Sequence, residues 1–244
     1  MNALGLLLLA IAAYWWWRTR GPGRTTPVHR RTNPGPIQGA GASADAHARE
    51  LRTPTVRIAT AIGIPTQAEA RAQRFEIGAI GERYVASLLG PLVHEGWTFL
   101  ADRRLPHGNA NVDILAISPK RKVYVLDPKK WTSRHRLTVH NGRLLHGTWD
   151  VSERMRGLVH ETRTVSRLLG VPAMPVAAMD GPMQPGTRLT VTVDRQTIRL
   201  VPASDICDAL RALDRQRIPA QTTAQSRAQL VATAKRLLPP KTRK

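Results

Sequence analysis

Two acidic side chains and a lysine occupy neighbouring segments that alternate like β-strands. In the run NVDILAIS, Asp113 shares one strand face with two aliphatic residues, because successive strand side chains point to opposite faces. In the next run, KVYVLDPKKW, Asp127 and Lys129 share a face with two valines. One face of the predicted sheet therefore offers two carboxylates and an ammonium group beside an apolar core.

These groups suit phosphodiester hydrolysis. Asp113 and Asp127 are expected to bind Mg²⁺, or another divalent cation such as Mn²⁺, because such ions take oxygen ligands and offset buried carboxylate charge. The ion polarises a phosphate and lowers the pKa of a bound water, and Lys129 would orient that water or stabilise charge on the phosphate. Glu82 lies at the edge of the apolar stripe of a predicted helix and would complete the metal shell or hold a water. All four residues are predicted to be catalytic, with the three acids as metal ligands.

A known family shares this order of residues. The stretches EIGAIGERYVASLL and DRRLPHGNANVDILAISPKRKVYVLDPKKW resemble the NERD (nuclease-related) domain, within the PD-(D/E)xK nuclease-like group. In that pattern a helix carries Gly-Glu, a hydrophobic segment carries Asp, and the next strand ends in acid-x-Lys followed by Trp or Tyr. The matching residues are Gly81-Glu82, Asp113, Asp127-Pro128-Lys129 and Trp131. The resemblance is strongest over residues 74–180 and implies a restriction-endonuclease-like core that hydrolyses DNA.

The elements that position these residues follow from periodicity. Residues 67–89 have helical spacing and end at Gly90-Pro91, with an apolar face formed by Ile77, Ile80, Tyr84, Val85 and Leu88. Asn141-Gly142 predicts a hairpin, and residues 152–169 predict a second amphipathic helix. The runs MPVAAM, LTVTV and IRLVP read as further strands. This order predicts an α/β (α+β) fold with a central mixed β-sheet flanked by helices.

The domain borders are drawn where composition changes. Residues 66–214 form the predicted NERD-like nuclease domain. Residues 19–65 are predicted to be a flexible basic linker, rich in Gly, Pro and Thr over its first part, with a short helix as the alternative for residues 45–65. Residues 215–244 contain no acidic residue and are predicted to be a basic, partly helical, solvated tail.

The N-terminal segment is predicted to be a transmembrane anchor over residues 1–18. Residues 3–17 are apolar and end in Tyr-Trp-Trp-Trp, side chains that favour the membrane–water boundary, and arginines follow at once. The positive-inside rule then places the remaining chain in the cytoplasm as a single-pass membrane protein. The alternative is a cleaved signal peptide, although such peptides normally start with basic residues and end in small ones.

The charge of the chain predicts a polyanionic partner. The formal net charge is +20, from 37 basic and 17 acidic residues, which favours nucleic acid, here DNA, or anionic lipid. The single cysteine, Cys207, excludes an intramolecular disulfide and fits a reducing compartment. Histidines 135, 140 and 146 have no cysteine near them and do not predict a zinc site.

Simpler interpretations stay open for each of these residues. Asp113 could cap a turn, Asp127 and Lys129 could form a structural ion pair, and Glu82 could be a solvated helix residue. Trp131 is predicted to pack in the core and not to stack on a base. Pro128 removes a ladder donor from its strand.

We therefore predict a membrane-tethered, metal-dependent nuclease, as an endonuclease or an exonuclease. The alternative is a catalytically inactive, membrane-attached nucleic-acid-binding protein of the same fold, which Pro128 favours. A third hypothesis is an interaction scaffold whose charge serves only lipid contact.

Overall fold

A six-stranded mixed sheet forms the centre of the computed structural model, which describes residues 37–216 and 225–241. Its strand order is β1-β2-β3-β7-β9-β8; β1, β2 and β3 are antiparallel, β3, β7 and β9 are parallel, and β8 is antiparallel to β9. The bounds are β1 (Thr98–Arg104), β2 (Asn111–Ile117), β3 (Val123–Lys130), β7 (Ala173–Asp180), β8 (Leu189–Val193) and β9 (Gln196–Pro202). The expected α+β fold with a mixed central sheet is confirmed.

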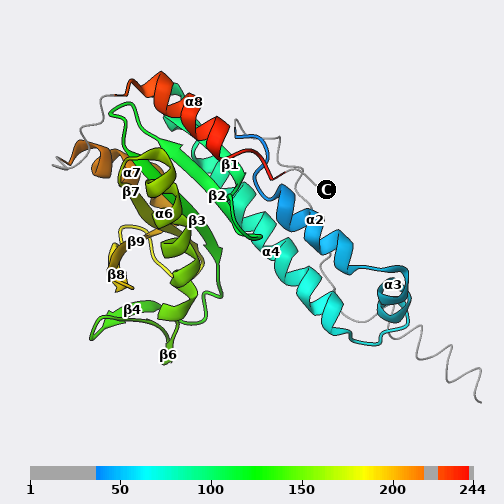
Figure 1. Cartoon of the computed structure of the whole chain (residues 1–244). Coiled ribbons are helices and arrows are strands. Elements are labelled where there is room, and N and C mark those ends of the chain that lie inside the picture. The colour runs from blue at the N-terminus through cyan, green and yellow to red at the C-terminus, as the bar shows by residue number, and fades with distance from the viewer. Residues whose placement is uncertain (1–36, 217–224, 242–244) are drawn as a thin grey trace, which may run out of the picture. The chain divides into compact units, whose positions relative to one another are not determined.

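Helices cover both faces of this sheet (Figure 1). On one face lie α4 (Gln67–Leu88), α5 (Gly90–His94) and α7 (Ile206–Arg215), which contribute Val85, Leu92 and Leu210 to the core. On the other face lie α6 (Arg156–Leu169) and α8 (Arg227–Leu237), which contribute Leu158 and Leu230. Because both faces are covered, the middle strands read as continuous apolar runs, and β2 and β3 are almost wholly buried up to their acidic residues.

A second, three-stranded sheet follows β3 in the chain. It contains β4 (Leu137–His140), β5 (Arg143–His146) and β6 (Trp149–Asp150), in that order, and a short 3₁₀ helix, η1 (Ser152–Met155), leads into α6. Asn141 and Gly142 both have positive φ, as the two-residue hairpin turn between β4 and β5 requires. The predicted hairpin is therefore confirmed. A second 3₁₀ helix, η2 (Ala203–Asp205), precedes α7.

Two helices occupy residues that the sequence assigned to a linker. They are α2 (Ala42–Leu51), which is rich in alanine, and α3 (Pro54–Ala61), which has the side chain of Thr53 as its N-cap. Helix α2 packs on α4 and buries Ala46 and Ala48. These helices agree with the alternative of a short helix for residues 45–65 and begin before the domain border expected at residue 66; residues 19–36 lie outside the described part.

The buried face of α4 differs from the predicted apolar stripe. Ile77, Ile80 and Tyr84 are 47%, 39% and 39% exposed. The buried positions are instead mostly small: Ala72, Ala79, Gly81, Glu82, Val85 and Ala86. Small side chains allow α2 and the sheet to approach α4 closely. The orientation of α4 therefore follows from the close packing of its small residues, and its large apolar side chains stay partly exposed.

Part of the predicted solvated tail belongs to the core. Helix α8 begins with a capping box at Ser226 and buries Leu230 and Ala234, and Leu238, the residue that follows the helix, is buried as well. Among residues 37–216 and 225–241, no helix is long and apolar enough to cross a membrane. The predicted anchor at residues 3–17 lies outside these ranges.

Candidate functional site

Strands β2 and β3 separate at the two predicted aspartates. Their ladder ends at the pair Ile114↔Leu126, although β2 continues beside β1 and β3 continues beside β7. Asp113 and Asp127 are the next residues past this last pair and stand opposite each other across the opening. The structure therefore places both carboxylates where the strands part.

Lys129 lies beside Asp127 on the same strand. Its Nζ atom donates to Oδ1 of Asp127 at 3.0 Å and lies 2.7 Å from Oδ2, so the contact is an ion pair as well as a hydrogen bond. Burial lowers the pKa of Lys129, but the carboxylates of Asp127, Asp113 and Glu161 outweigh it, so the pKa is raised. Lys129 is therefore held in its charged form at the opening.

Pro128 does not break the strand that carries these residues. Pairing between β3 and β7 continues through Lys130↔Asp180, two residues past Pro128. On the other side the ladder to β2 has already ended at Leu126, so the missing N–H costs no hydrogen bond to β2.

Glu82 reaches the opening because α4 runs very close to β3. A Cβ atom at Gly81 would lie 3.3 Å from Cβ of Lys130, which is tighter than normal contact, so glycine permits this approach. Glu82 is 7% exposed and accepts a hydrogen bond of 2.9 Å from the N–H of Gly41. Burial raises the pKa of Glu82 to about 7, assisted by the charges of Asp102 and Asp127 and opposed by the Gly41 hydrogen bond.

Asp113, at the start of the opening, is half-buried. It accepts a hydrogen bond of 3.3 Å from Nδ2 of Asn111. Burial raises the pKa of Asp113 well above its ordinary value, and the charges of Glu82, Asp127 and Glu161 raise it further. Asp113 and Glu82, placed 31 positions apart in the sequence, therefore act on each other electrostatically, as the prediction requires.

Glu161, on α6, is a member of the site that sequence reasoning missed. Burial raises the pKa of Glu161 well above its ordinary value, and Asp127 and Glu82 add to the rise while Lys129 opposes it. A signal was present, because Glu161 follows buried Leu158 by three positions and precedes buried Val165 by four, which places an acid on the apolar side of the helix.

Asp102, on β1, is a second residue that was not predicted. It adopts a φ of 49° and lies between the ladder pairs Ala101↔Ile114 and Arg103↔Val112, opposite Asp113. Its carboxylate accepts hydrogen bonds of 3.0 Å from the N–H of Ser43 and from Nδ2 of Asn111. The N-terminal end of α2 is therefore fixed to the site through both Glu82 and Asp102.

The donor set of this cluster is composed of carboxylates. Asp113, Asp127 and Glu161 interact with one ammonium group, that of Lys129, and Glu82 interacts with the acids. Three of these four acids have raised pKa values. Oxygen ligands with excess negative charge suit Mg²⁺ or Mn²⁺. Within the described residues no three His, Cys, Asp or Glu side chains are arranged as a metal-binding group. The cluster fits a divalent cation in its chemistry, and Lys129 balances part of its charge.

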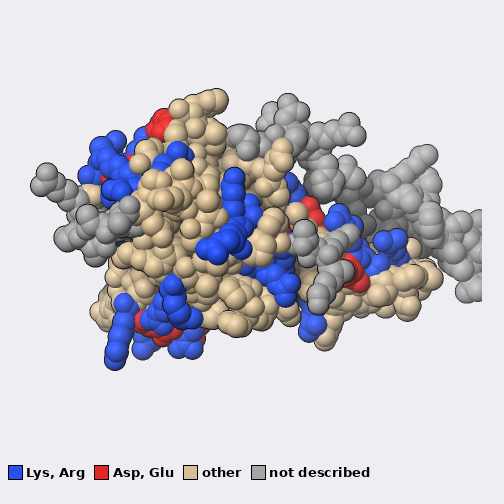
Figure 2. All heavy atoms as spheres, turned by 45° about the horizontal axis from the view of Figure 1, so that its top comes forward, with Lys and Arg blue, Asp and Glu red and all other residues tan. Residues whose placement is uncertain are grey.

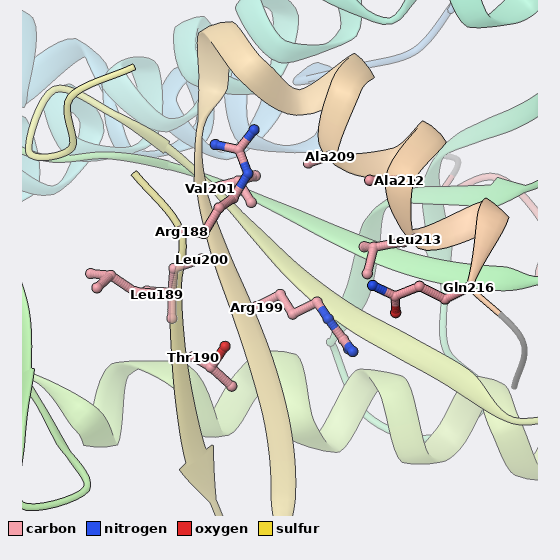
Figure 3. A pocket seen from close by; sticks show the side chains of 10 residues that line it. All are labelled: Arg188, Leu189, Thr190, Arg199, Leu200, Val201, Ala209, Ala212, Leu213 and Gln216. Carbon is pink, nitrogen blue, oxygen red and sulfur yellow. The ribbon is translucent and has the colours of Figure 1, made fainter. Parts of the chain in front are cut away.

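A pocket elsewhere in the domain does not overlap the acidic cluster. It lies between β8, β9 and α7, at the other edge of the sheet, where Figure 3 shows Arg188, Arg199 and Gln216 among its lining residues. No carboxylate lines it. Across the face displayed in Figure 2, Lys and Arg cover more of the surface than Asp and Glu, in keeping with a polyanionic partner.

The comparisons with known proteins give one result. No curated protein and no solved structure matches the chain. Residues 77–171 match the family model described as NERD, nuclease-related domain. This stretch contains Glu82, Asp113, Asp127, Lys129 and Glu161. The resemblance drawn from the sequence is therefore confirmed: residues 77–171 of this chain are similar to the nuclease-related domain.

Proposed function

We propose that this protein is a metal-dependent nuclease that hydrolyses phosphodiester bonds of DNA. The observation that carries the proposal is the gathering of four carboxylates and Lys129 at the opening between β2 and β3, inside the stretch that matches the nuclease-related domain. Buried like charges destabilise a fold, and such clusters are retained where they perform chemistry.

Each side chain has a role that follows from its position. Asp113, Asp127 and Glu82 would hold the cation, which supplies Lewis-acid polarisation of the phosphate and a more acidic water. Lys129, kept charged by its neighbours, donates hydrogen bonds to the phosphate oxygens as negative charge builds on them. In the metal-free protein burial raises the pKa of Glu82 to about 7, so binding of the cation would displace a proton from Glu82 near neutral pH.

The decisive experiment uses the purified full chain. Labelled DNA and RNA are incubated with Mg²⁺, with Mn²⁺ and with EDTA, and the products are separated on a denaturing gel. We expect cleavage only with a divalent cation, and its loss in Asp113→Asn with DNA binding retained. The matched control is Asp208→Asn, an exposed carboxylate of α7 with 78% of its side chain accessible. Metal-supplied protein that cuts neither DNA nor RNA would refute the proposal.

A binding protein of the same fold without catalysis is the second candidate. It is favoured by the absence, within the described residues, of a three-ligand metal group and by the direct pairing of Asp127 with Lys129. Such a protein binds DNA with a steep dependence on salt and no dependence on divalent cations. Binding and cleavage titrations against salt and against metal separate the two candidates.

We further propose that residues 3–17 tether the domain to a membrane, with the domain on the cytoplasmic side. The support is the apolar run, its terminal aromatic residues and the arginines that follow. Extraction of the native membrane fraction with alkaline carbonate tests the tether: an anchored chain stays in the pellet, whereas release of the chain contradicts it.

A further inference from the structure

Trp149 is a large aromatic side chain left in solvent at the edge of the small sheet. It is 61% exposed, and the other exposed large hydrophobic residues among those described all lie between positions 58 and 84. An indole presents an extensive apolar ring whose burial against a ligand is strongly favourable. Its position on β6, remote in sequence from the other exposed residues, calls for a separate explanation.

The local structure holds this indole in one place. Trp149 pairs with His146 across the turn between β5 and β6, and Gly147 in that turn has φ +65°. A Cβ atom at Gly147 would lie 3.1 Å from the ring of His135, so glycine lets that ring lie against the turn. The His135 ring meets Trp149 at 5.1 Å and 84°, an edge contact that supports the indole and cannot cover both of its faces.

Aromatic contacts connect the exposed indole to the strand that carries the site. His135 contacts His146 at 5.7 Å, and His146 contacts Trp131 at 5.5 Å between ring centroids. Trp131 follows directly after β3, two residues beyond Lys129, and packs partly buried against the core. The exposed ring is thus held to the end of β3 where the acidic cluster lies.

The surroundings of Trp149 carry unbalanced positive charge. Residues 131–156 contain five arginines and two acids. Both acids are paired with arginines, Asp150 with Arg143 at 3.8 Å and Glu153 with Arg156 at 2.8 Å. Arg134 and Arg136 are exposed and have no acidic partner within the described residues, and the exposed Arg154 has its guanidinium 5.3 Å from the centre of the Trp131 ring. The surface therefore pairs an open aromatic face with cations that can contact phosphates.

We propose that Trp149, supported by His135, whose chain neighbours are the exposed Arg134 and Arg136, is a stacking platform for unpaired bases of a single-stranded nucleic acid. A base in a duplex is already stacked on its neighbours, whereas a base in a single strand offers its face to an aromatic ring. The inference deepens the proposed function, because it assigns single-stranded or locally opened nucleic acid as the form that this domain holds beside its acidic cluster.

The test compares the affinity of the full chain for three labelled probes in EDTA. The probes are a mixed-sequence single-stranded DNA, the corresponding duplex, and a single strand of the same length in which abasic sites replace the bases. In Trp149→Ala we expect the affinity for the single strand to fall about 5- to 150-fold. The affinities for the duplex and for the abasic strand stay unchanged, because they depend on phosphate contacts. Trp149→Phe, which keeps a ring, retains most of the affinity.

The control is Phe75→Ala, which removes another aromatic side chain, 38% exposed, from the outer part of α4 and leaves all three affinities as in the wild type. An unchanged affinity of Trp149→Ala for the single strand, or an equal loss for all three probes, overturns the platform. A change from dimer to monomer in Trp149→Ala by sedimentation also overturns it, because the ring then covers a second copy of the chain. Cleavage by the wild type in Mg²⁺, measured on the same preparation, reports on the proposed function separately.

Discussion

Helix α4 carries two groups of charged side chains that balance their charges in different ways. In its first half, Glu69 and Glu76 both accept hydrogen bonds from Arg52, Glu69 at 2.8 and 2.9 Å, in a half-exposed network between α4 and the end of α2. In its second half, Glu82 is buried beside Asp102, Asp113, Asp127 and Glu161, and the nearby Lys129 compensates the charge of Asp113, Asp127 and Glu161.

The two groups move carboxyl pKa values in opposite directions. Hydrogen bonds from Arg52 lower the pKa of Glu69, whereas burial raises that of Glu82 to about 7. The charged form of Glu69 therefore stabilises the fold, and the charged form of Glu82 destabilises it. Because the surroundings of Glu82 lower the stability of the fold, we infer that they are retained for a function and not for stability.

The largest expected effect is that of Lys129→Met. The substitution leaves Asp113, Asp127 and Glu161 without their nearby cation, so we expect the free energy of unfolding to fall by about 2–4 kcal/mol. Cleavage falls by at least about 100-fold because the donor to the phosphate is lost. Urea unfolding and single-turnover cleavage measure the two effects.

Arg52→Met makes the matched change in the other group. We expect it to cost about 1 kcal/mol, because the network is partly solvated, and to leave cleavage intact. Lys129→Arg keeps the charge and recovers most of the stability lost in Lys129→Met. If Lys129→Met cleaved DNA at the wild-type rate, Lys129 and its acidic neighbours would be a structural ion-pair network, as Arg52 and its two glutamates are.

The next effect concerns pH. A folded-state pKa of Glu82 near 7, against 4.5 when unfolded, means that the folded protein binds an extra proton between these values, so stability falls as pH rises from about 4.5 to 7. The contribution is roughly 3 kcal/mol for a shift of this size. Glu82→Gln keeps an acceptor for the Gly41 N–H and removes the charge, so it should be more stable than the wild type at pH 7.

Unfolding of both proteins in urea and EDTA across pH 5 to 8 measures this difference. We expect the stability difference between Glu82→Gln and the wild type to grow with pH and to level off above about pH 7. A difference that stays constant with pH would show that Glu82 is charged throughout, as Glu69 is, and would remove the contrast between the two halves of α4.

Strand alternation was enough to predict part of the site. The parity argument placed Asp113, Asp127 and Lys129 together, and the ladder that ends at Ile114↔Leu126 brings them to one opening. This succeeded because strand geometry is local, with a period of two residues. The end of the β2–β3 ladder could not be predicted, because it depends on how β1 and β7 hold the two strands apart.

The helical contributions could be predicted only in part. Glu82 was expected near the sheet, but the stripe that included Ile77 and Ile80 is exposed, because the close approach of Gly81 to Lys130 turned α4 toward its small residues. Glu161 and the hydrogen bond from Gly41 depend on packing between segments far apart in the chain. Such contacts leave no periodic pattern in the sequence, and the one sign of them is a charged residue on the apolar side of a helix, as at Glu161.

The smallest effect is expected at Glu69. Glu69→Gln weakens a network whose side chains are 15% to 43% exposed, so we expect a loss of about 0.5–1 kcal/mol at pH 7. Because the folded-state pKa of Glu69 is lowered, this loss is present above about pH 4.5 and disappears as pH falls below it, the reverse of the trend at Glu82. High salt should shrink the loss through screening. Thermal unfolding in low and high salt at two pH values measures this loss of stability. A change in the cleavage rate of Glu69→Gln would contradict the comparison, because it would mean that the Arg52 network also supports the acidic cluster.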